Sequence, residues 1–187
     1  MHIEHTRLPG VFTLTPKRHG DARGFFEESW SAAAWAEAEL APQTWVQDNH
    51  SRSDAVGILR GLHFQSPPHA QAKLVRCIAG EIWDVAVDIR RGSPHYGQWV
   101  GVTLSARNGR QIFVPEGFLH GFVTRTADTE ITYKCAAPYA PHADGAVHWG
   151  SCGIDWDLGA PPTLSAKDAQ APALADFDSP FVYRNTL

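Results

Sequence analysis

Short runs of β-forming residues follow one another at regular intervals through most of this chain, and no long helical pattern separates them. Gly, Pro, Ser, Asn and Asp, which are the usual residues of turns, lie between the runs. The predicted strands cover residues 58–64, 73–78, 81–89, 99–104, 111–114, 118–124 and 130–135. This spacing is typical of an antiparallel sandwich or barrel. We therefore predict a mainly β fold, an antiparallel β-barrel of the jelly-roll kind with a few short peripheral helices.

The first half of the chain carries one clear helical pattern. Residues 31–40 are rich in Ala and Glu, Ser31 is a suitable N-cap, and Pro42 would end the helix. Residues 10–15 are a further strand candidate, and the glycines and aspartate of 19–24 predict a turn. Because neither an internal repeat nor a linker interrupts the chain, we predict a single domain over residues 1–187.

The alternation in residues 81–89 gives one of these strands two different faces. Apolar side chains occupy the odd positions from 83 to 89, whereas Asp84, Ala86 and Asp88 share the other face. Two acids on one face suggest a polar interior of the barrel. A solvent-exposed outer face explains the pattern about as well.

Composition narrows the class of protein. The net charge of −4 and the isoelectric point near 6.2 argue against nucleic acid as a partner. The three cysteines do not form metal-type pairs, so we predict free thiols in a reducing compartment. The first residues lack the apolar core of a signal peptide, and no window approaches the roughly 18 apolar residues of a membrane span. We predict a soluble, cytoplasmic protein that does not contact membranes.

Residues 57–74 combine apolar side chains with an unusual density of hydrogen-bonding groups. The polar members of the segment are Arg60, His63, Gln65, Gln71 and Lys73. Buried polar groups cost free energy unless they are matched, so a segment built only for packing would avoid them. We interpret this segment as the floor of a functional site.

Strict alternation along this segment separates two of its polar residues. Counting from Leu59, His63 and Gln65 lie on one face and Arg60 on the other. Arg60 and His63 can serve one pocket only if the strand is locally broken. A β-bulge at Gly61 would provide the break.

Two motifs resemble those of the cupin family of small barrels. Gly57 precedes His63 by six positions, and Gly109 precedes the run PEGFLH at residues 115–120. Metal-binding cupins use a His-x-His pair and a Glu in the first motif, but here Gln65 replaces the second histidine. We therefore predict a cupin-type barrel without a metal, in which His63 is free to act as a base.

Longer motifs resemble the dTDP-4-dehydrorhamnose 3,5-epimerase family from about residue 10 to residue 168. They are DARGFFEE (21–28), QDNHS (47–51), GILRGLHFQ (57–65), PPHAQAKLV (67–75), DVAVDIR (84–90), PEGFLHGF (115–122) and LSAKD (164–168). The resemblance implies inversion of C3 and C5 of dTDP-4-dehydro-6-deoxy-D-glucose to give dTDP-4-dehydro-L-rhamnose, a step in dTDP-rhamnose biosynthesis for cell-surface polysaccharide. Because inversion beside a ketone needs only an acid and a base, no redox cofactor is expected.

The resemblance also implies roles for individual residues. His63 matches the family's base, Asp168 would orient it, and Tyr133 matches the acid on the far side of the sugar. Lys73 and His120 match positions that line the sugar site, where they would stabilise the oxygen that becomes negative. The remaining matches are nucleotide-sugar contacts: Arg23, Glu28, Gln47, Asn49, Arg60, Asp144 (often Glu in the family) and Lys167. The family further implies a homodimer, in which the amino-terminal strands carry Arg23 and Glu28 into the partner's site.

Each of these assignments has a structural alternative. Residues 165–168 also form a capping box, so Asp168 could simply be an acid in the first turn of a short helix. Tyr133 could be a core tyrosine, His120 a structural histidine, and Lys73 a surface lysine whose stem is buried.

Three other functions also fit the sequence. The nearest is an epimerase that inverts only C3 or only C5 in an antibiotic-sugar pathway, because the motifs hardly discriminate between the two. From other classes, a metal-dependent cupin oxygenase and a non-catalytic sugar-binding cupin remain. The sequence does not reveal the nucleobase, the number of carbons inverted or the destination pathway.

Overall fold

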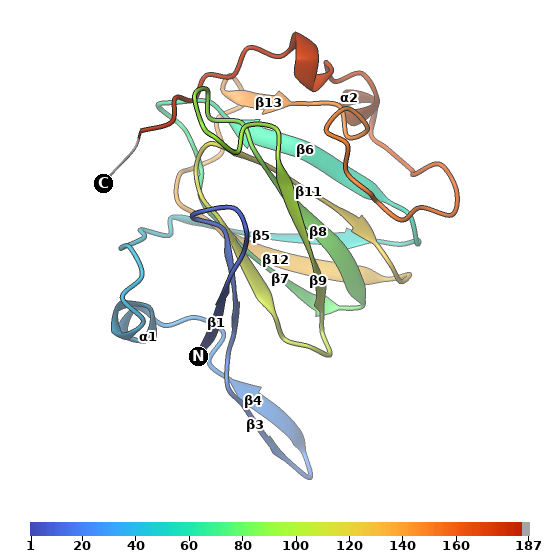
Figure 1. Ribbon diagram of the computed structural model, residues 1–187. Helices are drawn as coiled ribbons and strands as arrows, with labels where there is room; N and C mark the ends of the chain where they lie inside the picture. The colour runs from blue at the N-terminus through green and yellow to red at the C-terminus, as the bar shows by residue number, and fades with distance from the viewer. Residues whose placement is uncertain (185–187) are drawn as a thin grey trace.

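Two antiparallel sheets face each other in the computed structural model, which describes residues 1–184 (Figure 1). The six-stranded sheet has the order β1 (His2–His5), β2 (Phe12–Thr15), β10 (Gln111–Val114), β7 (Lys73–Ala79), β12 (Thr129–Cys135), β5 (Gln47–Ser53). The five-stranded sheet has the order β13 (Asp144–Ala146), β6 (Leu59–Gln65), β11 (Phe118–Thr124), β8 (Glu81–Asp88), β9 (Trp99–Ser105). The predicted antiparallel β architecture is confirmed, and the predicted strands agree with the observed ones to within about two residues.

Apolar side chains fill the space between the sheets. Val75 and Ile112 of the six-stranded sheet belong to one buried cluster with Ala86 and Leu104 of the five-stranded sheet. A second cluster covers the outer face of the five-stranded sheet, where Trp156 of the carboxy-terminal segment packs over β8. Both faces of the five-stranded sheet are therefore largely buried.

Of the two alternatives for the acidic face of β8, the structure confirms the one in which this face points into the barrel. Asp84 and Asp88 are both fully buried, and Ala86 between them belongs to the cluster that fills the barrel. Val85 and Val87 point the other way, into the cluster beneath the carboxy-terminal segment. A carboxylate inside a barrel needs a hydrogen-bonding or charged partner, so the partner of Asp84 is described with the site below.

The helices are few and short, as predicted. Helix α1 (Ala32–Glu37) starts at the predicted N-cap, where Ser31 accepts a hydrogen bond from the Ala34 N–H. It ends earlier than the predicted residue 40, because Glu39 has a positive φ of 55° that leaves the helical conformation. Helix α2 (Ala166–Ala169) and the 3₁₀ helix η1 (Leu174–Asp176) lie near the carboxyl end.

Several strands of the first half were not predicted. Strands β3 (Arg18–Asp21) and β4 (Gly24–Glu27) form a hairpin that projects away from the barrel (Figure 1). Strand β5 is an edge strand whose side chains alternate between partly buried and exposed. Little of the surface of these segments is buried within this chain. β3 and β5 are polar, and the two phenylalanines of β4 are exposed, so none of the three shows a clear pattern of buried apolar residues.

The predicted bulge lies at Gly61. His63 pairs with His120 of β11 and Arg60 pairs with Phe122, so three steps along β6 oppose two along β11. Gly61 has a φ of 130°, and a Cβ there would lie 2.6 Å from the Gly121 Cα. Only glycine allows this close approach. The bulge turns the Arg60 and His63 side chains into the same cavity.

Three further expectations concern the chain as a whole. All three cysteines are free and buried, as predicted, and burial raises the pKa of the Cys77 thiol to about 11. Among residues 1–184, no helix is long and apolar enough to span a membrane. The single domain over residues 1–187 stays a prediction, and its last three residues lie outside the described part.

Candidate active site

A cavity of about 610 Å³ opens between the two sheets, beside the loop that precedes α2. Six of the predicted site residues line it: Arg60, His63, Lys73, His120, Tyr133 and Asp168. They come from β6, β7, β11, β12 and α2. Because four of these five elements are hydrogen-bonded strands, the side chains are held on a rigid frame.

His63 and Asp168 are 105 residues apart in the chain but form a close pair. The His63 Nε2 lies 2.6 Å from the Asp168 Oδ1. The His63 side chain is 32% exposed toward the cavity, while that of Asp168 is 3% exposed. A buried carboxylate that holds one ring nitrogen leaves the other free for a ligand.

The surroundings of Asp168 keep it ionised. Burial alone would raise the pKa of this carboxyl, but hydrogen bonds from His63, Ser165 and the Gly61 N–H outweigh burial and lower the pKa. The Asp168 N–H in turn donates to the Ser165 Oγ, the N-cap of α2. The capping role and the pairing with His63 therefore coexist.

A second pair of the same kind lies deeper in the barrel. The His120 Nε2 lies 2.9 and 3.0 Å from the two carboxylate oxygens of Asp84. His120 is 8% exposed and Asp84 is fully buried. His120 was predicted at the sugar site, whereas Asp84 was predicted only as a polar residue of the interior.

Lys73 and Tyr133 present polar atoms to the cavity without a protein partner among residues 1–184. Desolvation lowers the pKa of the Lys73 ammonium, although the negative charges of Asp144 and Asp84 work in the opposite direction. Desolvation also raises the pKa of the Tyr133 phenol. At neutral pH the phenol is therefore protonated and can donate a proton or a hydrogen bond.

Arg60 is anchored to the edge strand β5. Its Nε donates to the Ser53 Oγ at 3.2 Å, and its Nη2 donates to the Arg52 carbonyl at 3.0 Å. These two bonds fix the plane of the guanidinium at the cavity wall. Its other nitrogen remains available for an anionic ligand.

Four further predicted residues lie outside the cavity lining. Gln47 and Asn49 are hydrogen-bonded to each other at 3.0 Å on β5. Asp144 of β13 forms an ion pair with Lys167 of α2 and also accepts a hydrogen bond from the Tyr139 hydroxyl at 3.2 Å. These two groups therefore form two polar pairs rather than converging with His63.

The structure does not bring Arg23 and Glu28 to the cavity of their own chain. Arg23 sits at the tip of the β3–β4 hairpin, where it pairs with Asp21, and both Arg23 and Glu28 are exposed. Phe25 and Phe26 on the same hairpin are 60% and 70% exposed. An isolated hairpin that exposes two aromatic rings is unusual for a surface that faces only water.

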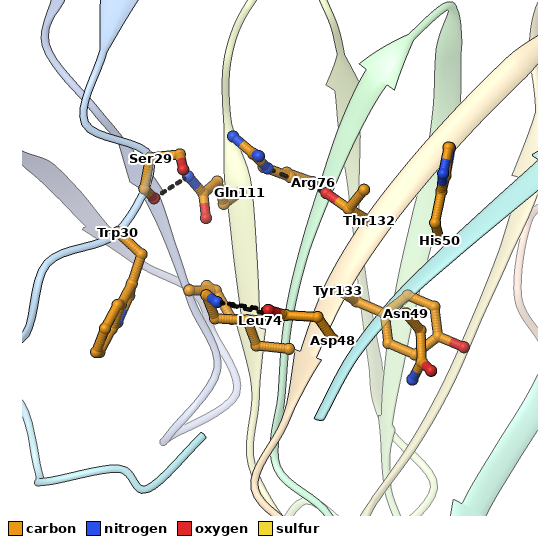
Figure 2. A pocket seen from close by; sticks show the side chains of 11 residues that line it. Ser29, Trp30, Asp48, Asn49, His50, Leu74, Arg76, Gln111, Thr132 and Tyr133 are labelled. Carbon is orange, nitrogen blue, oxygen red and sulfur yellow. Dashed lines mark hydrogen bonds and ion pairs between the residues drawn. The ribbon is translucent and has the colours of Figure 1, made fainter. Parts of the chain in front are cut away.

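A smaller pocket of about 280 Å³ lies on the outer side of the six-stranded sheet (Figure 2). Gln111 donates to the Ser29 carbonyl and Arg76 to the Thr132 hydroxyl across it, as Figure 2 shows. Tyr133 contributes to both pockets. Of the predicted acid and base groups, Tyr133 reaches this outer pocket, whereas His63, Lys73, His120 and Asp168 do not line it.

The position of a metal-binding histidine in cupins is taken by a fully bonded glutamine. The Gln65 Nε2 donates to the His69 and Pro138 carbonyls, and its Oε1 accepts from the Ala140 N–H. These bonds secure the loop after β6. In the part of the chain that the structure describes, no group of three His, Cys, Asp or Glu side chains is placed to hold a metal ion.

Comparison with known proteins decides the family. The family model described as dTDP-4-dehydrorhamnose 3,5-epimerase matches residues 5–176. The chain belongs to the dTDP-4-dehydrorhamnose 3,5-epimerase family. The dTDP-4-dehydrorhamnose 3,5-epimerase of Salmonella typhimurium is 51% identical to it over 176 residues, which are 93% of this chain and 96% of that protein.

The fold is similar to solved structures of a 3,5-epimerase and of a 3′-monoepimerase. A dTDP-6-deoxy-D-glucose-3,5-epimerase from Legionella pneumophila, in complex with dTDP-4-keto-L-rhamnose, has a TM-score of 0.92 and 44% identity. The match covers 98% of this chain and all of that one. A 3′-monoepimerase from Streptomyces bikiniensis, in complex with dTDP-quinovose, has a TM-score of 0.86 and 32% identity, covering 91% and 86% of the two chains. The cupin-type barrel expected from the sequence is confirmed by these matches.

Asp84 is the residue that the sequence analysis did not assign to the site. The alternation of β8 placed it inside the barrel, but its partner lies on another strand. In the antiparallel register His120 is opposite Ala86, so Asp84 is its diagonal neighbour on the same face. Knowledge that β8 and β11 pair in this register would have been enough to find the contact.

Proposed function

We propose that this chain inverts C3 and C5 of dTDP-4-dehydro-6-deoxy-D-glucose to give dTDP-4-dehydro-L-rhamnose, in dTDP-rhamnose biosynthesis. The observation that carries the proposal is one cavity that holds a histidine–aspartate pair and a protonated tyrosine, in a member of this isomerase family. The reaction needs no redox cofactor, because nothing is oxidised overall. We expect it to take place in the cytoplasm, as the sequence predicts.

The first step is removal of a proton from a carbon beside the ketone. His63 takes it with the ring nitrogen that is not bound to Asp168. Asp168 orients the ring and stabilises the imidazolium that forms, because its carboxylate stays ionised in this environment. A positioned base of this kind contributes about 10² to 10⁴ in rate.

Inversion requires that the new proton arrive on the opposite face of the sugar. Tyr133 comes from β12 of the six-stranded sheet, whereas His63 comes from β6 of the five-stranded sheet, so the two groups approach the cavity from opposite walls. The raised pKa of Tyr133 keeps its proton available at neutral pH. Tyr133 is therefore assigned as the acid.

The enolate between the two steps carries its charge on the ketone oxygen. Lys73 and His120 lie in the same cavity, and the Lys73 ammonium has no protein partner within residues 1–184. A cation that is already desolvated stabilises developing negative charge without reorganising first. Lys73 and His120 are assigned to that oxygen.

The nucleotide part of the substrate is assigned to polar groups at the cavity mouth. Arg60 suits a phosphate, because its guanidinium is already oriented by β5. Gln47, Asn49, Asp144 and Lys167 are proposed as further nucleotide-sugar contacts on the strength of the family motifs. Gln47 is already bonded to Asn49 and Asp144 to Lys167, and Tyr139 donates to both Gln47 and Asp144, so substrate would have to compete with these bonds.

Inversion of both carbons is favoured over inversion of one. The sequence is 51% identical to the 3,5-epimerase of Salmonella typhimurium and 32% identical to the 3′-monoepimerase. Proton NMR of the dTDP-linked 4-keto-6-deoxyglucose in heavy water tests this directly. Deuterium at both carbons flanking the ketone is expected, deuterium at one would establish the single-site alternative, and binding without any deuterium would point to a sugar-binding protein.

We also propose a homodimer in which the β3–β4 hairpin completes the partner's site. The exposed Phe25 and Phe26 would be buried in that contact, and Arg23 and Glu28 would reach the partner's nucleotide. Mixing Arg23→Ala protomers with His63→Ala protomers tests the exchange. Restored activity is expected, because the mixed dimer then holds one site with both residues, whereas unrestored activity would mean that Arg23 acts in its own chain.

The metal-dependent oxygenase is the less favoured alternative. Gln65 is occupied by three bonds to the loop after β6, and His63 is bound to Asp168. Metal analysis of the purified protein, with the exchange assay repeated after chelation, separates the two. A stoichiometric metal whose removal stops the exchange would contradict the acid–base proposal.

A further inference from the structure

The His120–Asp84 pair differs from the His63–Asp168 pair in what surrounds the carboxylate. Asp84 is fully buried, and within residues 1–184 its carboxylate forms hydrogen bonds only with His120, at 2.9 and 3.0 Å. A buried carboxylate without matched donors is costly. The proton on the His120 Nε2 is therefore the main compensation for the charge of Asp84.

The contact also determines which His120 nitrogen faces a ligand. With Nε2 held by Asp84, Nδ1 is the atom left for the cavity. A ring protonated only at Nε2 would present a lone pair there, which repels an oxyanion. A ring protonated at both nitrogens would present an N–H donor.

Lys73 lines the same cavity as His120, and its ammonium would be a second positive charge there. Desolvation lowers the pKa of its ammonium, and the charge of Asp84 is one of the influences that raise it. Two cations side by side would repel each other without a nearby anion. Asp84 is placed to be such an anion, because it contacts His120 and, together with Asp144, raises the pKa of the Lys73 ammonium.

We propose that Asp84 is a positioning residue of the epimerase: it orients His120 and balances an imidazolium, whose Nδ1–H joins the Lys73 ammonium in binding the enolate oxygen. The inference rests on the proposed function. It adds a role for Asp84, which lies in a family motif but was not among the predicted site residues. It also explains why two histidine–aspartate pairs occupy one cavity. One supplies a base and the other an electrophile.

The titratable groups that line the cavity with His120, or contact its ring, come from six other elements. They are His50 on β5, Arg60 and His63 on β6, Lys73 on β7, Asp84 on β8, Tyr133 on β12 and Asp168 on α2. Of the carboxylates nearby, that of Asp168 is bound to His63. Removal of the Asp84 charge should therefore take away one of the influences that raise the pKa of Lys73, and the basic limb of the pH–rate profile should move to lower pH.

Two substitutions at Asp84 test the proposal against a matched control. Asp84→Asn keeps a polar group but loses the charge, so kcat should fall about tenfold. Asp84→Leu removes both, so kcat should fall about 10²-fold, as for loss of an oxyanion donor. In both variants KM should change by less than about threefold, because the ground-state ketone carries little charge.

The control is Asp88→Asn, on the same strand and equally buried. Asp88 is bound by Arg90 and Ser93 rather than by a cavity residue. Its loss should change thermal stability but leave kcat per folded enzyme and the pH profile unchanged. If the Asp84 variants resemble Asp88→Asn in both readouts, Asp84 is merely structural and the proposal is wrong.

A double-mutant cycle and NMR complete the test. Because Asp84 would act through His120, Asp84→Leu should lower kcat much less in a His120→Asn background than in the wild type; equal losses would overturn the inference. The ¹⁵N signals of the His120 ring should show both nitrogens protonated at the pH of highest activity, and one in Asp84→Asn. A neutral His120 in the wild type would contradict the inference in an active enzyme, whereas wild-type protein that exchanges no protons would contradict the proposed function itself.

Discussion

The two histidine–aspartate pairs of the cavity use the same residue types in different surroundings. The Asp168 carboxylate receives a hydrogen bond from the Gly61 N–H as well as from His63, and the Ser165 side chain also lowers its pKa, so several groups offset its charge. Asp84 lies inside the barrel and relies on His120 among the described residues. His63 can therefore be neutral while other groups help to offset the charge of Asp168, whereas a neutral His120 would leave the buried charge of Asp84 without a hydrogen-bonded cation among the described residues.

The difference shows that the pair alone does not define a chemical role. A histidine held by an aspartate with other donors is suited to accept a proton. A histidine that alone compensates a buried aspartate is suited to keep its protons and stabilise negative charge. Enzymes commonly separate the tasks of similar groups in this way, by environment rather than by residue type.

The largest effect is predicted for His63→Ala. Because no other group would remove the proton beside the ketone, we expect product formation to fall by about 10⁴-fold. Calorimetric binding of dTDP should change less than about twofold, since His63 is assigned to the sugar. His142→Ala, an exposed histidine, is the control; activity in His63→Ala above one tenth of the wild type would reverse the assignment of the two pairs.

A loss of about 10² to 10⁴ in kcat is predicted for Asp168→Asn. The asparagine would no longer stabilise the imidazolium and would favour the wrong ring tautomer, an effect that reaches about 10⁴ in a hydrolase triad. Deuterium exchange into the substrate should fall in proportion to kcat with this substitution, because the base is affected, and should fall much less in Asp84→Asn, whose base is intact. If the two substitutions lower the exchange equally, the two pairs do not have different roles.

A decrease of about 10²-fold in net inversion is predicted for Tyr133→Phe. The base is intact in this variant, so His63 can remove a proton and return a deuteron to the same face. NMR in heavy water should show label entering the substrate faster than product forms. Equal losses of exchange and inversion would mean that Tyr133 is not the acid on the opposite wall.

The smallest effect concerns stability in acid. The folded-state pKa of Asp168 is lowered, so its ionised form stabilises the fold above the unfolded-state pKa of about 3.9, and this contribution is lost as the pH falls through the folded-state pKa. Urea unfolding followed by tryptophan fluorescence should therefore show a shallower loss of stability below pH 4 in Asp168→Asn. The exposed Asp178→Asn is the control; an unchanged slope in Asp168→Asn would contradict the account.

Much of the fold could be predicted from short-range patterns. Runs of β-forming residues bounded by turn residues located the strands between residues 58 and 135, and the bulge followed from the need to place Arg60 and His63 in one cavity. Strands β3 and β5 were missed because polar strands carry little hydrophobic signal, and β4 because its two phenylalanines are adjacent rather than alternating with polar residues. Helix α1 was predicted too long, since its sequence pattern does not show the positive φ at Glu39.

The site depends on longer-range information. His63 and Asp168 were placed together by family motifs, because no local pattern links residues 105 positions apart. Asp84 and His120 are 36 positions apart, and their contact follows from the register of β8 and β11, which alternation within each strand does not reveal. Contributions from a second copy, such as that proposed for Arg23, are not visible in one chain.

The most direct test of the two roles is deuterium exchange measured side by side for His63→Ala and His120→Asn. Both variants would be incubated with dTDP-4-keto-6-deoxyglucose in heavy water and followed by proton NMR at the two carbons flanking the ketone. We expect no deuterium at either carbon in His63→Ala and slow deuterium incorporation at both carbons in His120→Asn, because only the first variant lacks the base. Wild-type exchange in His63→Ala, with none in His120→Asn, would contradict it.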